Sequence, residues 1–330
     1  MSEIHVNRDS KLIKVLAAQA RRERVDSNAV EEASKIIMDL AKDMSPQNRH
    51  EIAQTIGYTI DELQQNELDF LGRVADIKNI EYGGKAAFNV RTGTVKAYIQ
   101  AKGSTTARSM VAGKQLLVDT QEISARPAIN VLDLRTGRVN MADLIREANH
   151  EMTNKKLKMI EGVLHGAIED YASPFYAMGT GIVKTTLDEQ LIYFRRLGPV
   201  SIVGDLAAVS QLSNIAGMAM NPNNQFSDDM INEYNNNGFL GRYVGSDVIA
   251  MNNAYEGGAT TPVLSADWLY LIPSSMSSDA RNLKVVNEGN VQAIESQNID
   301  DLVFEVRLDQ WFGAAFCSGR LPTIGAYKIN

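Results

Sequence analysis

The side chains best suited to acid–base or metal chemistry in this sequence are its four histidines, His5, His50, His150 and His165. None of them pairs with another at a metal-ligand spacing. His150-Glu151 begins like the zinc-protease motif H-E-x-x-H, but Asn154 stands where the second histidine is needed. We therefore interpret His150 as an exposed residue on a charged helix face, and the sequence predicts no metal site.

Motifs for phosphate binding or nucleophilic catalysis are incomplete. The stretch GTGIVKTT (179–186) has the residue types of a phosphate-binding loop, but Lys184 follows a valine instead of a glycine. The single cysteine, Cys317, lies in the apolar stretch FGAAFCSG, where a small buried side chain is expected rather than a nucleophile. The sequence thus predicts no catalytic residue, no cofactor and no enzymatic activity.

The distribution of charge is the first positive indication of function. The 330 residues carry a formal net charge of -7, yet residues 76–130 hold eight basic and four acidic side chains. Residues 171–330 hold nine basic and 16 acidic side chains. Opposite charge on two parts of one chain favours head-to-tail association of identical copies. The longest apolar runs are much shorter than a membrane span, and the N-terminus has no secretory signal pattern.

Within the positive region, the segment 85–114 contains no Asp or Glu; we call it the basic segment. Apolar residues alternate from Phe88 to Ile99, and a second extended run begins at Lys114. We predict a long antiparallel hairpin over residues 80–130 with a polar tip near Gly103–Ser109. Arms of a dozen residues would reach roughly 40 Å and would need a surface to lie on. The candidate contact residues are its six basic side chains, Lys85, Arg91, Lys96, Lys102, Arg108 and Lys114.

Helices are expected before and after this hairpin. Asp26 or Ser27 can cap a helix over 28–44, Ser45-Pro46 starts another that ends at Gly57, and a capping box at Thr59 starts a third that ends at Gly72. The clearest helix starts at Asn140 and runs to about Tyr171, which gives a rod of roughly 45 Å.

Strands are expected mainly in the second half. The pattern predicts a buried strand followed by a turn at Gly204-Asp205 and a helix, and further strands at 246–251 and 267–274. From Leu302 to Leu308 apolar residues alternate with polar ones, so that Glu305, Arg307 and Asp309 are predicted to face away from the core. The predicted class is α+β.

A nucleic-acid-binding role has two possible sources. Residues 51–65 fit a helix-turn-helix loosely, but the second helix carries Asp61 and Glu62 and no basic residue, so phosphate would repel it. The basic segment could itself enter a DNA groove, although it offers only Phe88 and Tyr98 for stacking. The simplest interpretation is a solvated basic hairpin; we favour the interpretation that it lies on the negative surface of an identical neighbour.

The order of these elements resembles the major capsid protein of tailed bacteriophages, a fold shared with encapsulin shells. The basic segment resembles the extended loop of that fold, and VNMADLIREANHEMTNKKLKMIEGVLHG (139–166) resembles its spine helix. GPVSIVGDLAAVSQLSNIAG (198–217) resembles the strand-turn-helix of its axial domain, and GRYVGSDVIAMN (241–252) the strand that follows. QAIESQNIDDLVFEVRLDQWFGAAF (292–316) resembles its late strands.

The resemblance implies a fold of five parts. These are an N-terminal helical arm (1–74), an extended β-hairpin loop with its lead-in (75–130), a peripheral domain with the spine helix and a β-sheet (131–195), an α/β axial domain (196–284), and late strands that return through both domains (285–330). The asparagine-rich loops at Asn221–Gly238 would then gather near five- and six-fold axes.

The resemblance also implies a function and partners. The chain would be a structural protein of the virion that assembles with itself, as hexamers and pentamers, into an icosahedral shell around double-stranded DNA bound without sequence specificity. Assembly would take place in the host cytoplasm with scaffolding and portal proteins, and no membrane would be involved. The extended loop would lie across the peripheral domain of an adjacent subunit.

Two features of some relatives do not transfer directly. Some lose a longer N-terminal region to a protease, whereas we expect residues 1–74 to be retained. Some cross-link a loop lysine to a neighbour's asparagine; Lys96 and Lys102 have the right position, but we do not predict that chemistry. The alternatives are an encapsulin-like compartment, a cytosolic α+β enzyme with a site of scattered carboxylates, and a DNA-binding protein that uses the basic segment.

Overall fold

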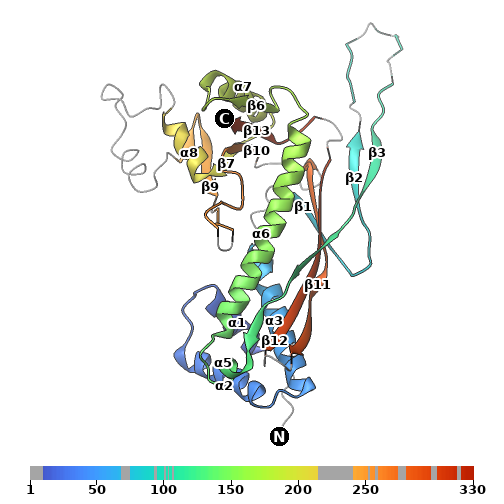
Figure 1. Ribbon diagram of the computed structural model, residues 1–330. Helices are drawn as coiled ribbons and strands as arrows, with labels where there is room; N and C mark the ends of the chain where they lie inside the picture. The colour runs from blue at the N-terminus through green and yellow to red at the C-terminus, as the bar shows by residue number, and fades with distance from the viewer. Residues whose placement is uncertain are drawn as a thin grey trace.

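The computed structural model describes residues 10–67, 75–92, 95–99, 102, 104–105, 108–214, 241–251, 253–256, 259–273, 280–298, 303–317 and 321–330. The described parts combine helices with three β-sheets, so the α+β class is confirmed. Figure 1 shows an elongated subunit in which the long helix α6 (Met141–Ile168) joins a helical end to a sheet-containing end. The predicted loops at Asn221–Gly238 lie outside the described residues.

The predicted long helix is confirmed as α6. Asn140 caps it, because its side chain accepts a hydrogen bond from the backbone N–H of Ala142. The helix ends at Ile168, three residues before the predicted end. Its buried apolar residues include Met141, Ile145, Ala148, Met152, Ile160, Leu164 and Ile168.

The N-terminal helices are α1 (Lys11–Ala20), α2 (Ser27–Lys42) and α3 (Pro46–Glu67). Asp26 caps α2 as predicted. The predicted break at Gly57 is wrong, because α3 continues through it. A Cβ at Gly57 would lie 3.2 Å from the Cβ of Ala293, so this glycine allows close helix–strand packing instead of ending a helix. Thr59 caps no helix, since its hydroxyl donates to the carbonyl of Thr55.

The first sheet has the order β1-β11-β12-β4, with β5 also paired to β12. Its strands are β1 (Ala75–Ile80), β4 (Gln121–Ala125), β5 (Ala128–Asn130), β11 (Leu283–Asn298) and β12 (Val303–Phe316). The helical arm, α6 and this sheet share one hydrophobic core, which includes Leu16, Ile37, Ile56, Ile145 and Leu308. The arm is therefore packed into the body of the subunit.

The alternating pattern of β12 is confirmed only in part. Phe304, Val306 and Leu308 are buried as predicted, whereas Leu302 lies outside the described residues. Asp309 was predicted to face away from the core, but it is 5% exposed. Its charge is balanced by Arg307, whose Nε donates to Asp309 Oδ1 at 2.8 Å.

The second sheet has the order β6-β13-β10-β7-β9-β8. Its strands are β6 (Tyr176–Gly179), β7 (Val200–Asp205), β8 (Arg242–Tyr243), β9 (Ser246–Met251), β10 (Trp268–Pro273) and β13 (Gly325–Ile329). The predicted strand-turn-helix is confirmed as β7 followed by α8 (Leu206–Gln211), which Asp205 caps. The sequence analysis did not predict α7 (Lys184–Arg195), whose Leu187, Leu191 and Phe194 pack on this sheet.

Candidate inter-subunit surface

The predicted hairpin is present but shorter than expected. β2 (Ala86–Thr92) pairs antiparallel with β3 (Ala112–Val118), from Ala86 opposite Val118 to Thr92 opposite Ala112. We call these two strands and their connection the ribbon. Further along the predicted hairpin, β4 and β5 belong instead to the first sheet, where both strands pair with β12. Figure 1 shows the ribbon extending outward from the side of the subunit.

The base of the ribbon rests on its own subunit. Ala86, Phe88 and Val118 are buried together with Val286 of β11. Two lysines lie against the ring of Phe88, with Nζ of Lys78 at 4.6 Å and Nζ of Lys284 at 5.5 Å from its centroid. The first sheet thus supplies the supporting surface that a two-stranded ribbon needs.

The predicted basic contact residues are spread along the ribbon and do not form one cluster. Arg91 lies opposite Gly113 in the ladder and Lys114 lies opposite Val90, while the side chain of Arg91 and the predicted tip residue Gly103 lie outside the described residues. Five side chains are exposed and form no ion pair with any other described residue: Lys85, Lys96, Lys102, Arg108 and Lys114.

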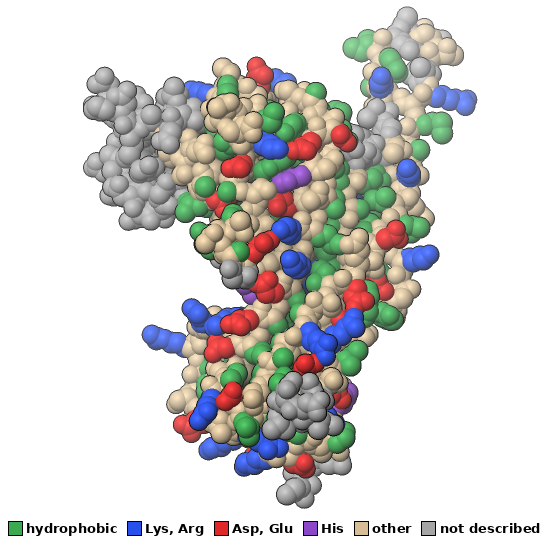
Figure 2. Space-filling view, viewed as in Figure 1, with side chains coloured by type: hydrophobic (Ala, Val, Ile, Leu, Met, Phe, Trp, Pro, Cys, Tyr) green, Lys and Arg blue, Asp and Glu red, His purple; other side chains and the backbone are tan. Residues whose placement is uncertain are grey.

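The sequence analysis missed the apolar side chains that the ribbon exposes. The alternation around Val95 and Ile99 suggested a half-buried strand, yet the two residues are 73% and 106% exposed. Met110 is 81% exposed, and Tyr98, Val111 and Leu117 are exposed as well. Between the arms, the backbone N–H of Lys96 donates to Ser109 Oγ at 3.1 Å. Figure 2 shows hydrophobic and basic side chains interspersed on the projecting part of the subunit. A solvent-exposed apolar patch of this kind is typical of an interaction surface.

Among the residues that the structure describes, no three His, Cys, Asp or Glu side chains are grouped suitably for a metal ion. His50 and His150 are exposed, and His5 lies outside the described residues. Cys317 is half-buried, so it is less buried than expected. Its backbone N–H donates to the carbonyl of Asn282.

His165 is the exception among the histidines, because it is packed between α6 and the second sheet. Its ring stacks on Trp268 with centroids 3.7 Å apart, and its Nε2 lies 2.7 Å from the hydroxyl of Tyr270. Glu161 Oε1 lies 3.7 Å from the same nitrogen. Burial lowers the pKa of His165 to about 4, an effect that Glu169 opposes and Lys328 reinforces.

This pKa predicts a loss of stability in acid. The unfolded chain binds a proton at His165 below about pH 6.5, whereas the folded chain does so only near pH 4. The free energy of unfolding should therefore decrease as the pH falls through this window, by roughly 1 kcal/mol between about pH 7.5 and pH 5 after allowance for partial exposure. Urea unfolding of His165→Gln should show a flatter pH dependence. The matched variant His150→Gln should retain the wild-type slope; equal slopes in all three proteins would contradict the assignment.

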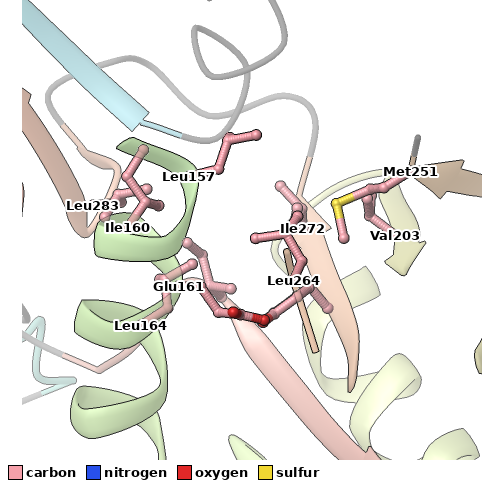
Figure 3. A pocket seen from close by; sticks show the side chains of 11 residues that line it. Leu157, Ile160, Glu161, Leu164, Val203, Met251, Leu264, Ile272 and Leu283 are labelled. Atoms are coloured by element: carbon pink, nitrogen blue, oxygen red, sulfur yellow. The ribbon is translucent and has the colours of Figure 1, made fainter. Parts of the chain in front are cut away.

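A cavity of about 60 Å³ lies beside this cluster, between α6 and the second sheet. Figure 3 shows Ile160, Glu161 and Leu164 of α6 facing Val203, Met251 and Ile272 of the sheet strands. Glu161 accepts a hydrogen bond from the backbone N–H of Ser265, and burial raises the pKa of its carboxyl group. Pockets that bind small molecules usually measure about 300–1,000 Å³. At about 60 Å³, this cavity is smaller than that range.

The family model described as "SPbeta prophage-derived putative capsid protein YonB" matches residues 1–328. No curated protein matches the sequence. None of the helices within the described ranges is both long and apolar enough to cross a membrane.

Two solved structures share the fold at low sequence identity. A chain from Gordonia phage Cozz is 12% identical, with a TM-score of 0.51 over 79% of this chain and 86% of that one. A chain from the capsid structure of the cyanophage P-SCSP1u is 8% identical, with a TM-score of 0.50 over 78% and 86%. Each likeness covers nearly four fifths of this chain, 79% and 78% respectively.

Proposed function

Since this chain belongs to the family of SPbeta prophage-derived capsid proteins represented by YonB, we propose that it assembles with copies of itself, as hexamers and pentamers, into an icosahedral shell around double-stranded DNA. Its role in the virion is structural and involves no catalytic step. Assembly takes place in the host cytoplasm with scaffolding and portal proteins, and the DNA is enclosed without sequence specificity.

The observation that carries this proposal is the ribbon. Its base is fixed on the subunit's own sheet, while the basic residues Lys96, Lys102 and Arg108 and the apolar residues Val95 and Ile99 remain exposed. A projecting element with both kinds of side chain is suited to dock on another molecule. The partner that fits is a second copy of this chain, because each copy carries a net charge of -7.

The basic and the apolar side chains of the ribbon have different roles in the proposed contact. The basic side chains guide the ribbon to an acidic neighbour and fix its register, while burial of the apolar side chains supplies affinity at about 25 cal/mol per Å² of apolar surface. The contact is heterologous, since the ribbon of one subunit meets a different surface of the next. Repeated around a closed symmetric shell, many weak contacts of this kind give a stable particle.

We propose the domain division that the sequence predicts, with boundaries at 74, 130, 195 and 284. One adjustment follows from packing: the helical arm shares its core with α6 and the first sheet, so it acts as part of the peripheral domain. The hydrogen bond from buried Lys156 on α6 to Gln64 Oε1 on α3, 2.7 Å long, favours an arm that stays in place after assembly.

The test is to express the chain alone, separate the products by size-exclusion chromatography and view them by negative-stain electron microscopy. We expect closed shells, sheets or tubes. Rings of five or six subunits would also support the proposal and would indicate that a scaffolding protein completes assembly. A monomer or dimer at high protein concentration would contradict it.

A further inference from the structure

The ribbon is joined to the body by two short segments, residues 81–85 before β2 and residues 119–120 after β3; we call them the root of the ribbon. Both segments lie against the first sheet near Glu288 of β11, which is opposite Trp311 of β12. Because a hairpin has no other covalent connection to the body, the conformation of the root determines the direction in which the ribbon leaves it.

One carboxylate contacts both segments of the root. Glu288 of β11 is 8% exposed. Its Oε1 accepts a hydrogen bond from the backbone N–H of Gly83 at 2.8 Å, and its Oε2 accepts one from the hydroxyl of Thr120. Hydrogen bonds to an ionised carboxylate are shorter and stronger than those between neutral groups. Glu288 therefore connects the start and the end of the ribbon through a single side chain.

The backbone around Glu288 is shaped for this contact. Gly289 follows it with φ = +67°, a conformation that favours glycine, and the β11–β12 register shifts between Glu288 and Gln292. Tyr82 of the root packs over this bulge and meets the ring of Trp311 edge-on, with centroids 4.7 Å apart.

On the other side, the second root segment lies unusually close to β12. A Cβ at Gly313 would lie 2.6 Å from the backbone oxygen of Asp119, so only glycine permits the observed approach. The first root segment thus packs on the bulge in β11, and the second packs on Gly313 in β12. Glu288 bonds to both segments.

We propose that Glu288, with Thr120, is a positioning residue that fixes the direction of the ribbon in the free subunit and so prepares it to dock on a neighbour. The docking part rests on the proposed function. A preset direction reduces the conformational entropy that docking would otherwise cost, whereas a loose root would leave the same contact residues in many orientations.

The test measures the direction of the ribbon apart from assembly. Spin labels are placed on Lys102→Cys in the ribbon and Lys155→Cys on α6, in a Cys317→Ser background. The distance between the two labels is measured by pulsed electron paramagnetic resonance. Labelled protein is diluted into unlabelled protein, so that only distances within one subunit contribute. The variants are Glu288→Ala, Thr120→Val and Thr120→Ser. Thr120→Val replaces the hydroxyl by a methyl group, whereas Thr120→Ser keeps the hydroxyl.

We expect one narrow distance distribution in the wild type and in Thr120→Ser, and broad distributions in Glu288→Ala and Thr120→Val. Unlabelled Thr120→Val should assemble roughly tenfold less efficiently in sedimentation assays, with recovery in Thr120→Ser. Narrow distributions in folded Thr120→Val and Glu288→Ala would overturn the positioning role. Broad distributions with wild-type assembly would overturn its link to docking.

The two proposals fail separately in this design. If the wild type does not assemble, the proposed function fails, but the distance distributions still decide whether Glu288 fixes the ribbon. Thr120→Val is the decisive variant if Glu288→Ala does not fold, because it leaves the carboxylate and its bond to Gly83 in place.

Discussion

Simultaneous replacement of Lys96, Lys102 and Arg108 by Glu is expected to abolish shell assembly and to leave the subunit folded. These side chains are exposed and form no ion pair with other described residues of their own chain, so folding does not depend on them. At the proposed contact, reversed charge would face an acidic neighbour and repel it. Because the contact is repeated throughout the shell, a small loss per contact prevents the particle from closing.

The measurement is size-exclusion chromatography and electron microscopy of the variant, with its thermal unfolding followed by circular dichroism. A matched control replaces three exposed lysines outside the ribbon, Lys14, Lys35 and Lys155, by Glu. Both variants change the net charge by the same amount, so the control separates a local effect from general repulsion. Intact shells from the ribbon variant would contradict the proposed role of these residues.

The second large effect is expected at the buried ion pair beneath the ribbon. Lys284 Nζ lies 2.8 Å from Asp76 Oδ2, and the side chains are 2% and 12% exposed. Replacement of Asp76 by Ala removes the carboxylate that balances a buried ammonium group. We expect the free energy of unfolding to fall by about 3–5 kcal/mol, because removal of one partner of a buried ion pair is strongly destabilising.

Urea unfolding of the unassembled subunit provides the measurement. The double variant Asp76→Leu with Lys284→Met should regain most of the lost stability, since apolar residues of similar volume can replace a buried pair. As a control, Asp39→Ala removes the partner of Lys42 in an exposed pair only 2.6 Å long, and it should have little effect. Equal effects of Asp76→Ala and Asp39→Ala would show that burial does not determine the contribution of the Lys284–Asp76 pair.

Elements governed by local patterns were predicted well: Asn140 caps α6, Asp26 caps α2, and β7 turns into α8 at Asp205. Side-chain capping and hydrophobic periodicity depend on residues within one or two turns of each other, so one segment contains the necessary information.

Errors arose where distant segments meet. Gly57 was predicted to end a helix. Instead, the absence of a side chain at Gly57 lets Ala293, which is far away in the chain, pack closely against α3. Asp309 was predicted to be exposed and is buried beside Arg307. α7 was missed because its helical pattern is weak and its stability comes from packing on the second sheet.

The sequence by itself determined the α+β class, the long central helix and the presence of a basic segment without any acidic residue. Charge and periodicity are properties of composition and order, and no fold is needed to count them. Only the tertiary structure decided how far the hairpin extends, which side chains it exposes and what holds its base. Those outcomes depend on β11, which supplies Val286 and Glu288. Glu288 lies 205 residues after Gly83 and 168 residues after Thr120 in the chain. Contacts over such separations are set by the packing of the whole molecule.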